Sequence, residues 1–248
     1  KNNLNEGKVF IEDYSHLKYK DYELMRNKCF SLAREHFNSS KYLIWADADW
    51  YINNIEALYN NLEKLYKNKD IYSIHQILVK HGINEHYKSN IVLTNSNVVY
   101  LRPIHEYLIN GEIGESISED IFFEWKDTKK SSNTRKKRLV EDIEVMKNLI
   151  ENDEDIERYT YYLARTYYYL YDNENALKYF FKRLEMKGYI DDLVDSILKI
   201  AEIYKENEWK NAFYYYWKSF TTDNSRIEGL YEISKYYNKS EQYLEQYT

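Results

Sequence analysis

The stretch KYLIWADADWYI, residues 41–52, decides how this chain is interpreted, because an apolar run ends in two aspartates, Asp47 and Asp49. The run YLIWA predicts a buried strand. Residues i and i+2 of an extended chain point the same way, so both carboxylates are expected to face one site at the carboxyl edge of a sheet. Two carboxylates so close repel each other, and a hard divalent cation, Mn²⁺ or Mg²⁺, would relieve that repulsion and hold a diphosphate.

An aspartate pair after a strand has two other interpretations. Phosphatases and mutases of the haloacid-dehalogenase type carry such a pair near the start of the domain, followed by a small β-branched residue. Here Trp50 and Tyr51 fill the following positions. Alternatively, the aspartates only cap a helix that begins near Asn53 or Asn54.

The composition limits the function classes. The chain has 248 residues, enough for one large domain or two small ones, and its 44% hydrophobic residues suffice for a real core. Its net charge of -6 argues against nonspecific binding of nucleic acid. The sequence shows no signal peptide, and no apolar run reaches the roughly 20 residues that span a bilayer. A single cysteine, Cys29, cannot form an internal disulfide, so a reducing, cytoplasmic compartment is expected.

The first half of the chain alternates between two hydrophobic periods. Strand-like runs are KVFIED (8–13), YLIWA (42–46), IYSIHQILV (71–79) and NIVLTNSNVVYLR (90–102), the last as a hairpin turning at Asn95 and Ser96. Helical patterns cover residues 22–37 and 54–68. Strands alternating with helices predict an α/β layer with a mainly parallel sheet.

After residue 130 the pattern is entirely helical. Leu139, Ile143 and Met146 form part of a 3.6-residue apolar stripe. Four or five further helices are expected, separated by polar breaks at residues 171–173, 187–188, 206–208 and 223–225. The segment SSNTRKK (131–137) is the expected joint, so the sequence predicts one domain over residues 1–130 and a second, all-α domain over residues 131–248.

A repeat runs through this second half. The trio Leu163, Ala164 and Tyr167 recurs as Ile200, Ala201, Tyr204 and as Ile233, Ser234, Tyr237; downstream of the first two trios lie Ala176 with Phe180 and Ala212 with Tyr216. This spacing of large, small and aromatic residues lets two helices approach closely, and it resembles tetratricopeptide repeats. An irregular bundle with coincidental spacing is the alternative. The tyrosine clusters at 161–162, 167–169 and 214–216 are expected to serve helix packing rather than ligand binding.

The central segment RNKCFSLAREHFNSSKYLIWADADWYI (26–52) resembles family 2 glycosyltransferases, which have the GT-A fold. Those enzymes have an Arg-Asn pair opening a helix, a strand, and then Asp-x-Asp. Downstream, VVYLRPIHEYL (98–108) looks like the family's His-Glu element, here His105 and Glu106. The subfamily it most resembles carries tetratricopeptide-like helices directly after the catalytic domain.

The resemblance implies inverting transfer of a sugar from a nucleotide-diphosphate donor, expected to be a UDP-sugar, to an acceptor hydroxyl on a glycan or protein. Asp49 would bind the metal, Mn²⁺ or Mg²⁺, and Asp47 would lie near the metal or the donor ribose. Arg26 and Asn27 would sit by the nucleotide or serve helix packing.

The base that takes the acceptor proton in such a transfer would be Glu106. His105 would complete the metal site or orient Glu106. Asp120 or Glu119, in the segment GESISEDIFF, is the alternative base.

The sequence also departs from the family. The resemblance implies a strand, a helix and a further strand ahead of KVFIED, yet only residues 1–7 precede it. We therefore expect either that this chain is a fragment of a longer protein or that much of the nucleotide pocket has been lost. The family often has an arginine in the strand before His-Glu, where this chain has NIVLTNSN. The competing hypothesis is therefore a non-catalytic scaffold, in which tetratricopeptide-like helices bind a protein partner beside a degenerate transferase domain.

Overall fold

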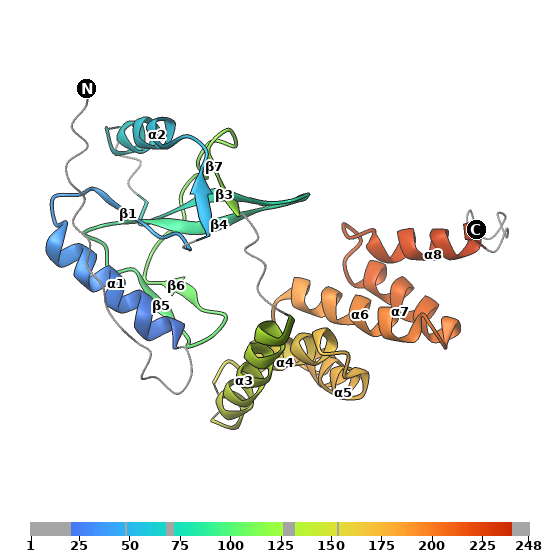
Figure 1. Cartoon of the computed structure of the whole chain (residues 1–248). Helices are drawn as coiled ribbons and strands as arrows, with labels where there is room; N and C mark the ends of the chain where they lie inside the picture. Colours follow the sequence, from blue (N-terminus) through green and yellow to red (C-terminus); the bar gives the residue numbers. More distant parts are fainter. Residues whose placement is uncertain (1–20, 48, 68–71, 126–131, 153, 240–248) are drawn as a thin grey trace. The chain divides into compact units, whose positions relative to one another are not determined.

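The computed structural model describes residues 21–47, 49–67, 72–125, 132–152 and 154–239. The chain divides into two compact units, Lys1–Lys129 and Lys130–Thr248, which we call the α/β unit and the helical unit (Figure 1). The division lies directly beside the boundary that the change of period predicts. The strand expected over residues 8–13 lies outside the described residues.

The α/β unit contains two helices and seven strands among its described residues. Helix α1 (Tyr22–His36) and helix α2 (Ile55–Lys67) confirm both helical predictions. The side chain of Asp21 caps α1 by accepting a hydrogen bond from the N–H of Leu24. The strands are β1 (Tyr42–Ile44), β2 (Trp50–Ile52), β3 (Ile74–His81), β4 (Asn84–Leu93), β5 (Val99–Leu101), β6 (Tyr107–Ile109) and β7 (Phe122–Trp125).

The main sheet is mixed, with the strand order β1-β4-β3-β7-β2. Only β3 and β7 run parallel; the other neighbours are antiparallel, so the prediction of a mainly parallel sheet is wrong. The reason is the tight turn at Gly82, whose φ of 60° suits glycine and folds β3 straight back into β4. The hairpin predicted at Asn95 and Ser96 is also wrong, because β4 belongs to this sheet whereas β5 pairs with β6 in a second one.

Helices cover both faces of the main sheet. Leu58 and Leu62 of α2 pack with Ile77, Val79 and Ile91 on one face. Phe30 of α1 packs with Val92 and Tyr100 on the other. Ile91 and Val92 are successive residues of β4, so strand alternation sends them to opposite cores. The α/β unit is therefore a sheet between two apolar layers.

The helical unit consists, in its described residues, of α3 (Ser132–Glu151), α4 (Ile156–Tyr169), α5 (Asn173–Leu184), α6 (Ile190–Tyr204), α7 (Trp209–Thr222) and α8 (Glu228–Lys239) (Figure 1). The predicted breaks are confirmed. The segment 131–137, expected as a joint, is helical from Ser132 onward, because its lysines and arginine have good helix propensity. No helix in the described part of the chain has the length and apolarity needed to cross a membrane.

The repeated small and large residues meet at the helix crossings. Leu163, Ala164, Ile200 and Ala201 are fully buried in α4 and α6. Ala176 and Phe180 in α5, and Ala212 and Tyr216 in α7, are buried as well. Small residues at these positions let each helix lie close against the next.

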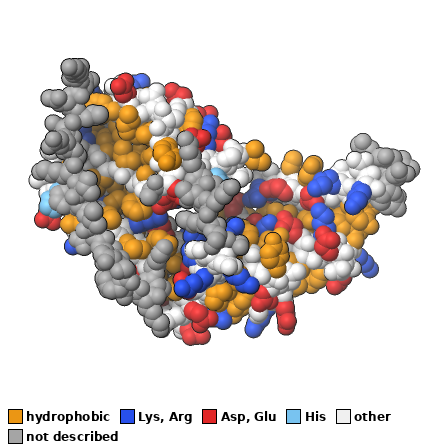
Figure 2. Space-filling model, in the orientation of Figure 1, with side chains coloured by type: hydrophobic (Ala, Val, Ile, Leu, Met, Phe, Trp, Pro, Cys, Tyr) orange, Lys and Arg blue, Asp and Glu red, His pale blue; other side chains and the backbone are white. Residues whose placement is uncertain are grey.

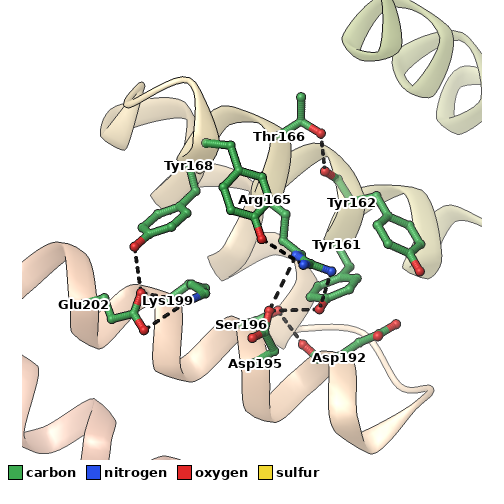
Figure 3. Close-up of polar contacts among 11 residues, drawn as sticks. Tyr161, Tyr162, Arg165, Thr166, Tyr168, Asp192, Asp195, Ser196, Lys199 and Glu202 are labelled. Atoms are coloured by element: carbon green, nitrogen blue, oxygen red, sulfur yellow. Dashed lines mark hydrogen bonds and ion pairs between the residues drawn. The ribbon is translucent and has the colours of Figure 1, made fainter. Parts of the chain in front are cut away.

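Tyrosines join α4 to α6 through their hydroxyl groups (Figure 3). Tyr161 donates a hydrogen bond of 2.9 Å to Asp195, and Tyr168 donates one of 2.7 Å to Glu202. Arg165 reaches the Tyr161 hydroxyl at 3.3 Å and lies 3.8 Å from the Asp195 carboxylate. A tyrosine of α4 can thus pack its ring among the helices while its hydroxyl donates a hydrogen bond to α6. This double use explains part of the unusual tyrosine content.

Substituting Gly229 by alanine is expected to loosen α8. A Cβ atom there would lie 2.2 Å from the carbonyl oxygen of Tyr216 and 2.5 Å from Oγ of Ser219, both on α7. The clash should lower the free energy of unfolding by about 1–3 kcal/mol, although alanine favours a free helix. Hydrogen exchange of the α8 amides measures the effect. Asn238→Ala, at an exposed position of the same helix, is the control and should leave exchange unchanged. Equal exchange in both variants would contradict the close packing.

Figure 2 shows one face of the molecule, on which acidic and basic side chains are interspersed. On the described part of this face, the Lys and Arg side chains do not form a continuous positive surface of the kind that attracts the phosphate backbone of nucleic acids. This agrees with the net charge of -6.

Candidate functional site

Asp47 and Asp49 lie between β1 and β2, outside both strands. The carbonyl of Asp47 accepts a hydrogen bond of 3.0 Å from the N–H of Trp50, so the chain folds back here instead of continuing the strand. The prediction that the two carboxylates follow an extended chain is therefore wrong. Asp49 is held separately, because its Oδ2 accepts a 3.2 Å hydrogen bond from Nε1 of Trp125 on β7.

The start of α1 is fastened to β5 and to the loop that follows it. The side-chain amide of Asn27 donates to the Tyr100 carbonyl at 2.8 Å and accepts from the Tyr100 N–H at 2.7 Å. The N–H of Tyr22 donates to the carbonyl of Pro103 at 2.9 Å, and the Glu23 carboxylate accepts from the N–H of Arg102. Asn27 thus has the structural role that was one of its two predicted alternatives.

The loop between β5 and β6, residues 102–106, carries the His-Glu pair in a constrained backbone. Arg102 has a φ of 85° and His105 a φ of 50°, values that side-chain-bearing residues adopt at an energetic cost. Ile104 is buried whereas His105 is exposed. The two positive φ angles, together with the contacts to α1, fix the direction in which Glu106 leaves the loop.

Glu106 forms an ion pair with Arg26 of α1, and both side chains are largely buried, at 12% and 9% exposed. The Arg26 guanidinium also lies 4.5 Å from the ring centroid of Trp45 and 4.9 Å from that of Tyr100. Its Nε makes no hydrogen bond with any described group. Arg26 was predicted to sit by the nucleotide or to serve helix packing; its ion-pair partner in the structure is the carboxylate predicted to be the base.

Lys88 of β4 is a charged neighbour that the sequence did not single out. Burial lowers the pKa of its ammonium, and the charges of Asp47, Arg26 and Glu106 act on it. The same three charges act on the buried hydroxyl of Tyr100, where burial raises the pKa to about 12. Arg26, Asp47, Lys88, Tyr100 and Glu106 therefore form one group, which we call the Arg26–Glu106 cluster.

Lys88 was missed because the strand expected from the sequence begins at Asn90, whereas β4 begins at Asn84 and carries a β-bulge. The pairing with β3 jumps from His75↔Ile91 to Gln76↔Ser89, so Asn90 is an extra residue in β4. Lys88 lies opposite Ile77, which is fully buried. The bulge determines which face of the sheet the residues before Asn90 point to.

The two alternative bases, Asp120 and Glu119, make contacts with residues outside the Arg26–Glu106 cluster. Asp120 is exposed, its carboxylate accepts a hydrogen bond from the Ser118 hydroxyl, and its carbonyl accepts one from Asn53 at 2.7 Å. It is not one of the charges that act on Lys88 or Tyr100. Glu119 accepts a hydrogen bond from the hydroxyl of Tyr87 at 3.1 Å.

The predicted metal ligands do not assemble as one set. Among the described residues, no three His, Cys, Asp or Glu side chains come close enough to hold a metal ion, so His105 does not join Asp47 and Asp49 in such a group. A set of three protein ligands is not required by every metal. Mg²⁺, and Mn²⁺ by analogy, is commonly bound by one or two carboxylates, with substrate phosphates and water completing the shell.

Comparison of the sequence with models of protein families and with curated proteins finds no match.

Proposed function

We propose that the α/β unit transfers a sugar from a nucleotide-diphosphate donor to an acceptor hydroxyl. The observation that carries the proposal is the Arg26–Glu106 cluster itself. Arg26, Asp47 and Glu106 are far apart in the sequence, yet their charges act on the same two groups, Lys88 and Tyr100. These are the residues to which the resemblance assigns donor binding and proton transfer, and their proximity is what such a reaction needs.

Each side chain has a defined task in this proposal. Asp47 and Asp49 would hold a divalent cation, which when bound neutralises charge on the diphosphate. Glu106 would take the proton of the acceptor hydroxyl as the acceptor oxygen attacks the anomeric carbon. The bond between that carbon and the diphosphate oxygen breaks, and the electron pair leaves with the nucleoside diphosphate. Arg26 would hold Glu106 in place through one carboxylate oxygen.

The proposal extends to the class of each unit. The α/β unit would be a GT-A-like domain, supported by the helix layers on both sheet faces and by the aspartates between β1 and β2. The helical unit would be a tetratricopeptide-like array, supported by the buried small residues Ala164, Ala176, Ala201 and Ala212. Such an array would bind the acceptor or a protein partner.

Calorimetric titration of UDP-sugars tests the proposal. We expect binding in the presence of Mn²⁺ that weakens at least about 10-fold in EDTA, because the carboxylates alone repel the diphosphate. Asp49→Asn should lose the metal-dependent part, since an amide is a poor ligand for a hard cation. Asp120→Asn, an exposed aspartate outside the cluster, is the matched control and should bind as the unmodified chain does.

Two outcomes would contradict the proposal. Equal affinity with Mn²⁺ and with EDTA, or in Asp49→Asn, would remove the metal role of the aspartates. Absence of binding by UDP-sugars and by other nucleotide-sugars under both conditions would favour the non-catalytic scaffold.

A further inference from the structure

Lys88 is a partly buried cation whose position calls for an anion. Its Nζ lies 4.7 Å from the ring centroid of Trp50, and the described residues provide it with no ion-pair partner. A lysine held in this way, without a paired carboxylate, can take an anionic ligand. The negative charges that act on it, Asp47 and Glu106, both have another use in the proposed reaction.

Once a divalent cation is bound, the other charges of the site would leave the positive charge of Lys88 without a counter-charge. Arg26 and Glu106 neutralise each other in their ion pair. A divalent cation on Asp47 and Asp49 would neutralise those carboxylates in turn. The ammonium of Lys88 is then the charge left over, and the species that enters the site next, the donor, carries a negatively charged diphosphate.

Two further donors lack acceptors. Nε of Arg26, in the cluster, and Nε1 of Trp45, whose ring centroid lies 4.5 Å from the Arg26 guanidinium, are buried N–H groups without a hydrogen-bond partner among the described groups. Buried donors are nearly always satisfied in folded proteins, and an oxygen-rich ligand is one way to satisfy them. This second observation points to an anion and is independent of the position of Lys88.

We propose that Lys88 binds the diphosphate of the donor directly, as a fixed cation of the site beside the metal carboxylates. The inference rests on the proposed function, because it names a residue of that site and the part of the substrate it contacts. The Trp50 ring holds the lysine at its charged end through a cation–π contact, which limits where the ammonium can move. A compact ammonium of this kind suits phosphate oxygens as a point charge.

The test is titration of the full chain with UDP, uridine and inorganic pyrophosphate, with Mn²⁺ and with EDTA. Lys88→Gln and Lys88→Met both remove the charge, and methionine keeps an apolar stem against Trp50. We expect UDP to bind about 10-fold to 100-fold more weakly to both variants, the worth of a charge-assisted hydrogen bond. Uridine, which has no phosphate, should bind equally to all chains, and Lys88→Arg should retain most of the UDP affinity.

Lys80→Gln is the matched control. Lys80 also lies on this hairpin, in β3, with its Nζ 4.4 Å from the ring centroid of Phe122, but it is paired with Glu85 at 2.9 Å. Lys80 makes the same kind of ring contact as Lys88, but its charge is paired. Removing the charge of Lys80 should therefore leave UDP binding unchanged. A loss in Lys80→Gln equal to that in Lys88→Gln would overturn the inference by showing a general charge effect.

The remaining outcomes separate this inference from the proposed function. Unchanged UDP affinity in Lys88→Gln and Lys88→Met, with metal-dependent UDP-sugar binding intact, overturns the role of Lys88 and leaves the transferase. Pyrophosphate binding that depends on Lys88, without any nucleotide-sugar binding, supports the anion site and overturns the transferase. Binding of neither UDP nor pyrophosphate overturns both.

Discussion

Replacing Glu106 by glutamine is expected to lower the rate of sugar transfer by about 10²-fold to 10⁴-fold, the usual contribution of a general base. The amide cannot take up the acceptor proton, but it still offers an oxygen to Arg26. The ring contacts of Arg26 with Trp45 and Tyr100 remain available to its charge. Release of UDP from a UDP-sugar, with water as acceptor, measures the rate, and calorimetry should show donor affinity within about 3-fold of the unmodified chain.

Asp120→Asn is the control for this rate measurement. It neutralises the other carboxylate considered from the sequence, which is exposed and hydrogen-bonded to Ser118. We expect its rate to stay unchanged. Full activity in Glu106→Gln together with a loss in Asp120→Asn would exchange the two roles and reject Glu106 as the base.

The second large effect is on stability. Arg26→Met should lower the free energy of unfolding of the α/β unit by about 3–5 kcal/mol, because it leaves the buried carboxylate of Glu106 without its cation. Hydrogen exchange of amides in β5 and β6 measures this within the intact chain. Lys28→Met, an exposed position on the same helix, should change stability by less than about 0.5 kcal/mol.

A double variant shows whether the unpaired charge is the cause. Arg26→Met combined with Glu106→Leu removes both charges, and apolar replacement of a whole buried pair is often near neutral. The double variant should therefore be more stable than Arg26→Met alone. If it is less stable by the sum of the single effects, the ion pair is not the source of the loss.

Local patterns predicted the helices well, and the reason is physical. Helices α1 and α2 and the helices after residue 131 are built from hydrogen bonds within each segment, so the period of apolar residues and the breaks between them determine their positions. Strand partners are chosen over long distances. β2 pairs with β7 and β1 with β4, and nothing local in YLI or WYI indicates those partners or their direction.

The sequence singled out Arg26, Asp47 and Glu106 as candidate site residues, and their roles stay predictions. It did not indicate that Arg26 and Glu106 form an ion pair. Which side chains pair depends on how α1 is fastened to the loop after β5, through Asn27 and the Tyr100 backbone. Lys88 escaped prediction because the strand expected from the sequence begins at Asn90, whereas β4 begins at Asn84.

The contrast between the two units has a consequence for the order of folding. In the helical unit each helix lies against its sequence neighbours, from α3 with α4 to α7 with α8, so contact order is low and collapse should be fast. The position of Asp49 depends on a distant strand, because its carboxylate accepts a hydrogen bond from Trp125 and β2 is paired with β7. In refolding, helical signal should therefore return before Asp49 reaches its final position. The segment to which we assign chemistry is therefore expected to take its final structure late, after β7 has formed and paired with β2.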